Sequence, residues 1–266
     1  MRENRVKRVM REGGLGIAGY VSFADPALVE IIGLAGFDGA FIDMEHTSFD
    51  LNMIERMIRA TELMGITSII RVPDNDAKLI LRILDMGGQG IIVPHVDGVE
   101  GARKAVEAVR YAPMGARGGA GNTRAAQYGA VPWREHVQSS NDEILLSVMV
   151  EDGKAISEVE EIASLDGVDV VGLGPTDLSE LLGVTDPQDP RLRQKVDEIA
   201  SIVRRVGKAK LSIPVNHSAL PLTARDLMDL GAGYTHVGPP PTTVVMNALR
   251  DSAKRIREEL GRGVAA

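Results

Sequence analysis

Apolar residues follow two alternating patterns along the chain. Short runs rich in Val, Ile and Leu recur between longer segments whose apolar residues are spaced three and four positions apart. Uninterrupted apolar runs are typical of strands buried on both faces of a parallel sheet, and the wider spacing is typical of amphipathic helices. The pattern therefore predicts strands and helices in alternation, with the helices covering a parallel sheet.

This alternation continues from one end of the chain to the other. The helices include Pro26–Gly36 and Phe49–Gly65, and the last one is predicted over Thr242–Gly261. The predicted strands end at or near Phe23, Asp43, Arg71, Val96, Glu151, Gly174, Val215 and Gly238. Eight parallel strands joined by right-handed helical crossovers close into a barrel. We predict an α/β protein with one domain, a (β/α)₈ TIM barrel over residues 1–266.

One long connection departs from the rhythm. Met114–Asp142 is rich in Gly, polar and longer than an ordinary connection. Because it comes after the fourth strand, we expect it at the carboxyl edge of the barrel, shaping a substrate pocket. Its glycines, Gly118, Gly119 and Gly121, have two interpretations: turn residues, or residues that approach the substrate directly.

Composition limits the classes of function. Hydrophobic residues make up 44% of the chain but aromatic residues only 3%, which suits the aliphatic core of a barrel. The net charge of -7 and the lack of a basic stripe argue against binding to nucleic acid. The chain has no cysteine, which excludes disulfides, thiol catalysis and Cys-ligated zinc.

The chain also lacks signals for a membrane or for export. No apolar stretch reaches the roughly 18 residues of a membrane span. The basic N-terminus is not followed by the apolar segment of a secretory signal. We therefore expect a cytoplasmic enzyme.

Charged residues stand where the predicted strands end. They are Asp43 with Glu45 and His46, then Arg71, Glu151 and Asp177. The carboxyl ends of parallel strands meet at one edge of the barrel, where α/β enzymes bind their ligands. The sequence therefore predicts a single site for metal-assisted chemistry on an anionic substrate.

Glu151 and Asp177 are the candidate metal ligands. They end neighbouring strands, and two carboxylates in a dry cleft need a proton or a cation between them. Oxygen ligands with open positions suit Mg²⁺ or Mn²⁺. The alternative is that each carboxylate caps the helix that follows it.

Arg71 and His46 are the candidate catalytic residues. The guanidinium of Arg71 can bind an oxoacid or stabilise an enolate oxygen, or else form an internal salt bridge to a carboxylate. His46 can serve as a general base, with Asp43 and Asp85 as residues that orient it, or it is a structural histidine.

Backbone N–H groups, and motifs that the sequence lacks, limit the classes of substrate and reaction further. Gly174 and the amides of Thr176 and Asp177, in the sequence GPTDLS, offer a seat for a carboxylate at a helix start. The prolines of Gly238–Pro241 lack the N–H groups of a phosphate site, and no nucleotide-binding glycine motif is present. No lysine stands clearly at a strand end inside the barrel, which disfavours a Schiff-base aldolase.

These segments together resemble the metal-dependent class II pyruvate aldolases of the HpcH/HpaI family. The similarity runs through GIAGYVSFADP, AGFDGAFIDMEH, RVPDNDAKLILRILDMGGQGIIVPHV, RYAPMGARGG, VMVED and GVDVVGLGPTDLS, which is nearly the whole chain. The family includes aldolases for 4-hydroxy-2-oxoheptanedioate and 2-dehydro-3-deoxyglucarate. The resemblance implies retro-aldol cleavage of a 4-hydroxy-2-oxoacid to pyruvate and an aldehyde, through a metal-stabilised enolate.

The resemblance also implies roles and partners. Glu151 and Asp177 would bind the divalent ion, which is Mg²⁺ or Mn²⁺, with Co²⁺ and Zn²⁺ as further candidates. Arg71 would hold the 2-oxo oxygen, His46 would be or would position the base with Asp85 and Asp43, and the amides of Thr176 and Asp177 would take the pyruvate carboxylate. The family forms homo-oligomers, and a hexamer or trimer using the C-terminal helix is implied.

Two departures keep other reactions open. Met149 stands where the family usually has Gln, and Met44 where it often has Gly. Relatives such as macrophomate synthase and siderophore-type citrate synthases use the same enolate differently. The alternatives are an oxaloacetate decarboxylase or an enolate-using C–C synthase, and a non-catalytic metabolite-binding barrel.

Overall fold

Eight parallel strands form a closed barrel in the computed structural model, which describes residues 1–186 and 189–260. Each strand pairs with its neighbour in the chain, and β8 pairs with β1 to close the ring. The predicted (β/α)₈ barrel is confirmed. The strands are β1 (Gly16–Val21), β2 (Gly39–Asp43), β3 (Thr67–Arg71), β4 (Gly90–Val93), β5 (Leu145–Met149), β6 (Val170–Gly172), β7 (Lys210–Ser212) and β8 (Ala232–Val237).

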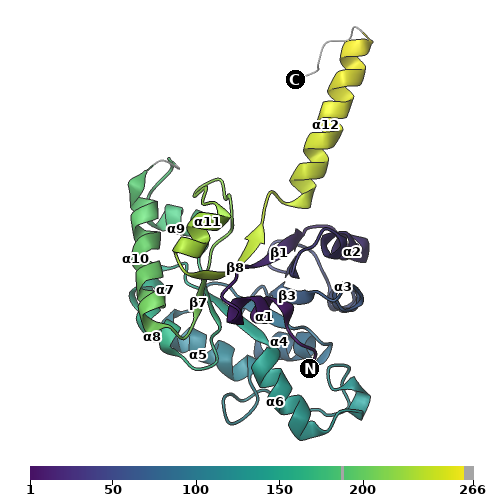
Figure 1. Cartoon of the computed structure of the whole chain (residues 1–266), viewed down its shortest axis with the longest axis vertical. Helices are drawn as coiled ribbons and strands as arrows, with labels where there is room; N and C mark the ends of the chain where they lie inside the picture. Colours follow the sequence, from purple (N-terminus) through teal and green to yellow (C-terminus); the bar gives the residue numbers. More distant parts are fainter. Residues whose placement is uncertain (187–188, 261–266) are drawn as a thin grey trace.

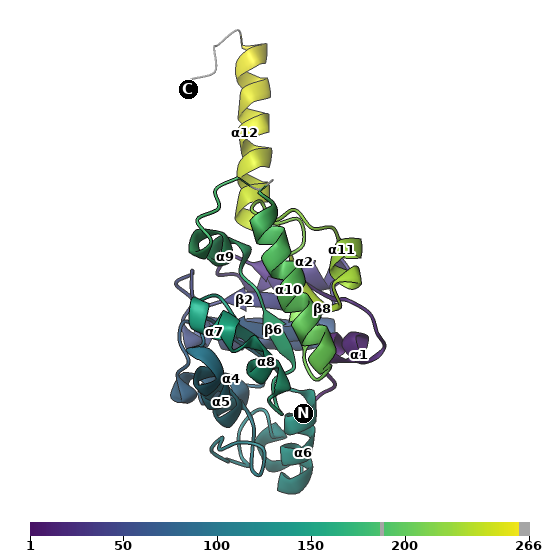
Figure 2. The ribbon, with the colours of Figure 1, turned by 90° about the vertical axis from the view of Figure 1, so that its left-hand side faces the viewer.

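Helices surround the barrel, and one of them projects away from it (Figures 1 and 2). The predicted end of the last helix at Gly261 lies outside the described residues. The helices are α1 (Arg5–Arg11), α2 (Pro26–Leu34), α3 (Leu51–Met64), α4 (Ala77–Asp85), α5 (Gly98–Val109), η1 (Gln127–Gly129), α6 (Trp133–Glu143), α7 (Gly153–Ser157), α8 (Val159–Ser164), α9 (Pro175–Leu181), α10 (Pro190–Val206), α11 (Ala224–Asp229) and α12 (Pro241–Glu259).

Alternate residues of each strand face the inside and the outside of the barrel. Phe41 and Ile69 belong to a small buried cluster inside the barrel, whereas Ile42 and Ile70 belong to the large cluster between strands and helices. Side chains of a strand alternate between its two faces, so every second residue follows Phe41 or Ile69 inward. Asp43 and Arg71 therefore continue the inward-facing rows at the carboxyl edge.

Local signals account for the helix ends. Asp50 accepts a hydrogen bond from the backbone N–H of Met53 and so begins α3. The same helix ends at Gly65, whose φ of 65° is in the left-handed region that glycine adopts without strain. Asp152 caps α7 in the same way by accepting from the N–H of Ala155.

The long segment Met114–Asp142 lies at the opposite edge from the one predicted. It follows α5, which returns the chain to the amino ends of the strands, and Figure 1 shows α6 at the end of the barrel farthest from α12. The expectation of a pocket-shaping loop at the carboxyl edge of its own barrel was wrong. A segment that follows the helix of a β/α unit lies at the amino edge, because the helix runs antiparallel to the strand before it. A Cβ on Gly119 would come within 2.6 Å of the Trp133 ring, so this glycine permits close packing.

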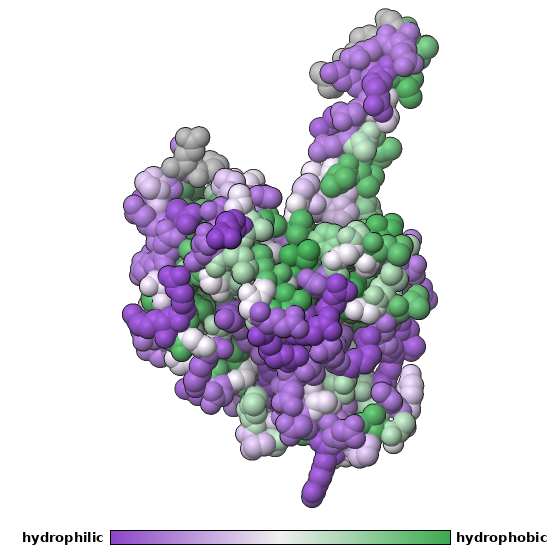
Figure 3. All heavy atoms as spheres, viewed as in Figure 1, coloured by the Kyte–Doolittle hydropathy of each residue, from purple (hydrophilic) through white to green (hydrophobic). Residues whose placement is uncertain are grey.

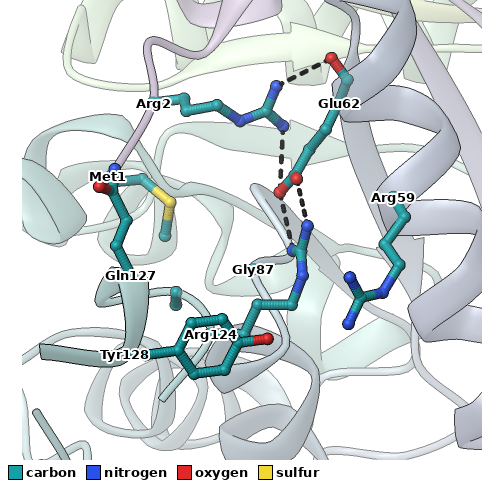
Figure 4. A pocket seen from close by; sticks show the side chains of 9 residues that line it. Met1, Arg2, Arg59, Glu62, Gly87, Arg124, Gln127 and Tyr128 are labelled. Atoms are coloured by element: carbon teal, nitrogen blue, oxygen red, sulfur yellow. Dashed lines mark hydrogen bonds and ion pairs between the residues drawn. The ribbon is translucent and has the colours of Figure 1, made fainter. Parts of the chain in front are cut away.

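Ion pairs connect three segments at the amino edge of the barrel. Glu62 of α3 lies between the guanidinium groups of Arg2 and Arg124 (Figure 4). The Arg124 group also donates to the carbonyl of Met86 at 2.7 Å. These contacts join the N-terminal segment, α3 and the long segment. The cavity that they border is far from the carboxyl ends of the strands.

Helix α12 extends beyond the barrel with none of its residues buried. Hydrophobic side chains lie along one side of it (Figure 3), among them Val245, Met246 and Leu249. None of the helices in the described part of the chain is long and apolar enough to cross a membrane.

Arg110 is the largest of the fully buried side chains. Its guanidinium donates to the carbonyl oxygens of Ile144 and Gly167, each at 2.7 Å, and to the carboxylate of Asp169 at 2.6 Å. Arg110 thus connects the end of α5 to the segments that lead into β5 and β6.

We expect Arg110→Ala to lower the free energy of unfolding by about 3–5 kcal/mol, because it removes a buried guanidinium that donates to the carbonyls of Ile144 and Gly167 and to the carboxylate of Asp169. Urea unfolding monitored by circular dichroism measures this. The exposed pair Arg193–Asp197 provides the control, since Arg193→Ala should cost less than about 1 kcal/mol. Equal effects of the two substitutions would contradict the structural role given to Arg110.

Candidate active site

The predicted site residues come from successive strands at the carboxyl edge of the barrel. Asp43 and Arg71 are paired directly in the β2–β3 register, so their inward side chains lie side by side. Glu151 comes two residues after β5, and Asp177 is in the first turn of α9, after β6.

Arg71 is held by two carboxylates. Its Nε and Nη2 donate to the two oxygens of Asp43 at 2.9 and 2.7 Å, and its Nη1 lies 3.0 Å from Glu45. Asp43 is completely buried and also accepts from the hydroxyl of Tyr20 at 2.6 Å. The guanidinium hydrogen bonds to Asp43 hold the pKa of this carboxyl below its usual range against the opposing effect of burial. The internal salt bridge considered for Arg71 is therefore present.

Arg71 nevertheless keeps hydrogen-bonding capacity. A guanidinium has five N–H groups, and both Nη1 and Nη2 carry two. The contacts with Asp43 and Glu45 use one on each nitrogen, which leaves one on each for a substrate oxygen. The geometry suits a fixed, charged donor for an oxoacid.

Glu45 lies between two histidines. One of its oxygens is 3.6 Å from Nε2 of His46, and the other is 3.6 Å from Nε2 of His95. His95 also reaches Glu151, with its Nδ1 3.4 Å from a carboxylate oxygen that accepts from the His95 backbone N–H at 3.2 Å. The polar side chains thus form a continuous row from the end of β2 to the residues after β5.

Glu151 and Asp177 face the same point in space. A Cβ on Gly174 would lie 2.5 Å from an oxygen of Glu151 and 2.7 Å from an oxygen of Asp177. Only glycine leaves this space open between the two carboxylates. The cap of the following helix comes from the neighbouring Asp152, so Glu151 does not serve as a cap.

In the part of the chain that the structure describes, no lysine or arginine forms an ion pair with Glu151, whose ionic neighbour is His95. Burial, and then repulsion from Asp177, raise the pKa of Glu151 to about 7. A divalent cation between the two would remove this repulsion, and carboxylate oxygens are the ligands that Mg²⁺ and Mn²⁺ prefer. Among the described residues, no group of three or more acidic, His or Cys side chains forms a ready-made metal cage. The pair fits an ion that takes its remaining ligands from substrate and water.

The start of α9 supplies backbone donors beside this pair. The first N–H groups of a helix have no partner within it, and the N-cap residue Gly174 has no side chain to satisfy them. The amides of Thr176 and Asp177 are in this first turn. They could receive a carboxylate next to the Glu151–Asp177 pair.

Neither of the two residues predicted to orient His46 contacts it. Asp43 contacts Arg71 and Tyr20 and not His46, whose imidazole is two-thirds exposed. Asp85 ends α4 at the amino edge of the barrel, where its carboxylate accepts from Arg117 at 2.7 Å. Within one chain the structure therefore does not bring Asp85 to His46, because the length of the barrel separates them.

Sequence reasoning did not single out His95 or Tyr20. Tyr20 could have been found from its inward position near the end of β1, two residues after the inward-facing Ala18. His95 could not, because it follows β4 in a left-handed conformation with a φ of 46° that an alternating pattern does not show.

The fold and the site define a TIM-barrel enzyme with an acidic pair and an arginine at the carboxyl edge. Residues 17–219 match the HpcH/HpaI aldolase/citrate lyase family, and the chain belongs to this family. This confirms the resemblance found in the sequence and identifies the chain as a carbon–carbon lyase; the non-catalytic alternative is set aside.

Individual proteins are similar over almost the full length. The chain is 33% identical over 256 residues to a hydroxypyruvate/pyruvate aldolase of Pseudomonas aeruginosa, covering 96% of this chain and 93% of that protein. It is 31% identical over 255 residues to a 4-hydroxy-2-oxo-heptane-1,7-dioate aldolase of Shigella sonnei, covering 95% of both. The crystal structure of an HpcH/HpaI aldolase from Desulfitobacterium hafniense superposes with a TM-score of 0.84 at 25% identity, covering 95% of this chain and 96% of that one.

The charge repulsion at Glu151 gives a stability prediction for the metal-free protein. Because the pKa of Glu151 is higher in the folded chain than in the unfolded chain, the folded chain binds more protons between about pH 4.5 and 7. Stability should therefore fall as the pH rises through this range. In EDTA at pH 8, we expect Glu151→Gln to raise the free energy of unfolding by about 1–3 kcal/mol, with a smaller gain at pH 5.

Urea unfolding at both pH values measures the effect. Glu30→Gln, on the exposed surface of α2, removes a negative charge without this environment and should change little. The interpretation fails if Glu151→Gln is less stable than the wild type at pH 8, or if its effect is the same at both pH values.

Proposed function

We propose that the chain catalyses reversible retro-aldol cleavage of a 4-hydroxy-2-oxoacid to pyruvate and an aldehyde. The observation that carries the proposal is the pair Glu151–Asp177, which shares one open space in the same row of polar side chains as Arg71. Aldolases among the similar proteins support it, and their names add hydroxypyruvate as a second candidate donor.

Glu151 and Asp177 would hold the divalent ion, Mg²⁺ or Mn²⁺, with Co²⁺ or Zn²⁺ as further candidates. When bound, such an ion polarises the 2-oxo group of the substrate as a Lewis acid. The amides of Thr176 and Asp177 would fix the carboxylate of the substrate, and Gly174 keeps the approach open.

Arg71 would stabilise the negative charge that forms on the 2-oxo oxygen. As the C3–C4 bond breaks, its electrons move into the C2–C3 bond and onto this oxygen, which makes pyruvate enolate. Asp43 and Glu45 fix the guanidinium plane of Arg71. Its remaining N–H groups would then donate to the negatively charged oxygen of the enolate. The role of Asp43 is then to orient Arg71.

His46 would act as the base that takes the proton from the 4-hydroxyl as the aldehyde forms. Its exposed imidazole lies beside Glu45, with Nε2 3.6 Å from a carboxylate oxygen that would orient the ring. Asp85 could support His46 only from another copy of the chain, since its own barrel separates the two residues.

Assembly and location are part of the proposal. The unburied α12, with apolar residues along one side, supports a homo-oligomer, a hexamer or a trimer. The cytoplasmic location stays a prediction.

The test compares two adjacent acidic residues. Glu151→Gln should weaken Mn²⁺ binding, measured by electron paramagnetic resonance, and lower kcat/KM for cleavage of a 4-hydroxy-2-oxoacid by more than about 100-fold, because a direct ligand is lost. Asp152→Asn is the matched control, since Asn caps a helix as well as Asp does. It should leave both quantities nearly unchanged.

Unchanged Mn²⁺ affinity and cleavage in Glu151→Gln would contradict the ligand assignment. The same proteins should be assayed for oxaloacetate decarboxylation. Glu151-dependent turnover of oxaloacetate without cleavage of any 4-hydroxy-2-oxoacid would favour the decarboxylase or synthase alternative.

A further inference from the structure

A cavity of about 480 Å³ lies at the carboxyl ends of β7, β8 and β1, beside the site. Its polar lining residues include Tyr20, Asn216, His217, Ser218, His236 and Thr243, and prolines and valines make up most of the rest. Apart from Tyr20, which donates to Asp43, these residues have no role in the proposed cleavage.

The cavity borders the reacting groups on two sides. Tyr20, in its wall, donates to Asp43, the carboxylate that holds Arg71. His236 stacks on Phe41 with ring centroids 4.5 Å apart, and the Arg71 guanidinium is 5.4 Å from the centroid of the same Phe41 ring. On the other side, His217 is close enough to Asp177 to be influenced by its charge.

The described residues that line the cavity carry no charge at neutral pH. None of them is Asp, Glu, Lys or Arg. Burial lowers the pKa of His236 to about 4, so this imidazole is neutral. The wall combines an apolar surface of proline and valine with the uncharged hydrogen-bonding groups of Asn216, Ser218 and Thr243.

We propose that this cavity receives the aldehyde half of the substrate and selects uncharged aldehydes over aldehydes that carry a carboxylate. The inference rests on the proposed aldolase function and names its substrate class. A carboxylate placed here would lose its hydration against a wall that contains no cationic side chain, while the nearby guanidinium of Arg71 is already paired with Asp43 and Glu45. An alkyl or hydroxylated aldehyde meets apolar wall or neutral hydrogen-bonding groups instead.

The synthetic direction offers the cleanest assay. Pyruvate C3 loses a proton and its enolate carbon bonds to the aldehyde carbon, while the carbonyl oxygen of the aldehyde gains a proton and becomes the 4-hydroxyl. Butanal and succinic semialdehyde have the same four-carbon chain and differ in the terminal carboxylate. We expect kcat/KM with pyruvate to be at least about tenfold higher for butanal, because electrostatic mismatch disfavours the acid.

A positive charge added to the cavity should weaken this preference. Ser218 is exposed after β7, and Ser218→Arg should shift the ratio of the two kcat/KM values toward succinic semialdehyde by about tenfold, chiefly through its KM. Ser201→Arg makes the same change on the exposed outer surface of α10 and should leave the ratio unaltered.

Exchange of the pyruvate methyl protons with D₂O, followed by NMR in each variant with Mg²⁺, shows whether the enolate still forms. Absence of exchange in the wild type would overturn the proposed function and this inference with it. Exchange together with equal or better use of succinic semialdehyde by the wild type would overturn this inference alone. An unchanged ratio in Ser218→Arg that still exchanges pyruvate would do the same.

Discussion

The parallel register of β2 and β3 is the constraint on which the site depends. It pairs Asp43 directly with Arg71, and the alternation of side chains turns both into the barrel. The resulting bidentate contact fixes the guanidinium plane where the strands end. Burying either charge alone would be strongly unfavourable, so the two residues stabilise each other while they shape the site.

The charges on the other side of the barrel are balanced differently. Arg71 offsets Asp43 and Glu45, but Glu151 and Asp177 face each other around Gly174 without a cation from the described side chains. Burial, and then repulsion from Asp177, raise the pKa of Glu151. A divalent ion bound between the two carboxylates would remove their repulsion.

The local sequence was sufficient for the barrel and for most of the site. The apolar runs ending at Asp43 and Arg71 are strands in the structure, and Gly65 ends its helix as expected. Parallel strands with helical crossovers leave few arrangements for such segments, which is why residues far apart in sequence could be assigned to one edge.

The errors came from contacts that do not follow from local pattern. The segment Met114–Asp142 lies at the amino edge because it follows α5, which runs back along the barrel after β4. The contact of Arg71 with Glu45 depends on how far the two side chains extend, which the strand pattern does not show. The position of His95 depends on its left-handed backbone conformation, which the pattern does not show either. Asp85 is the last residue of α4, which ends at the amino edge of the barrel, and its carboxylate there accepts a hydrogen bond from Arg117.

The central claim is that pyruvate binds at a cation held by Glu151 and Asp177. Its most direct test is paramagnetic relaxation of ¹³C-labelled pyruvate by Mn²⁺ in the presence of the protein. We expect strong relaxation of the C1 and C2 carbons in the wild type, a weaker effect on the methyl carbon, and loss of all three effects in Glu151→Gln. Relaxation that is the same in Glu151→Gln, or that is absent while Mn²⁺ and pyruvate both bind, would contradict it.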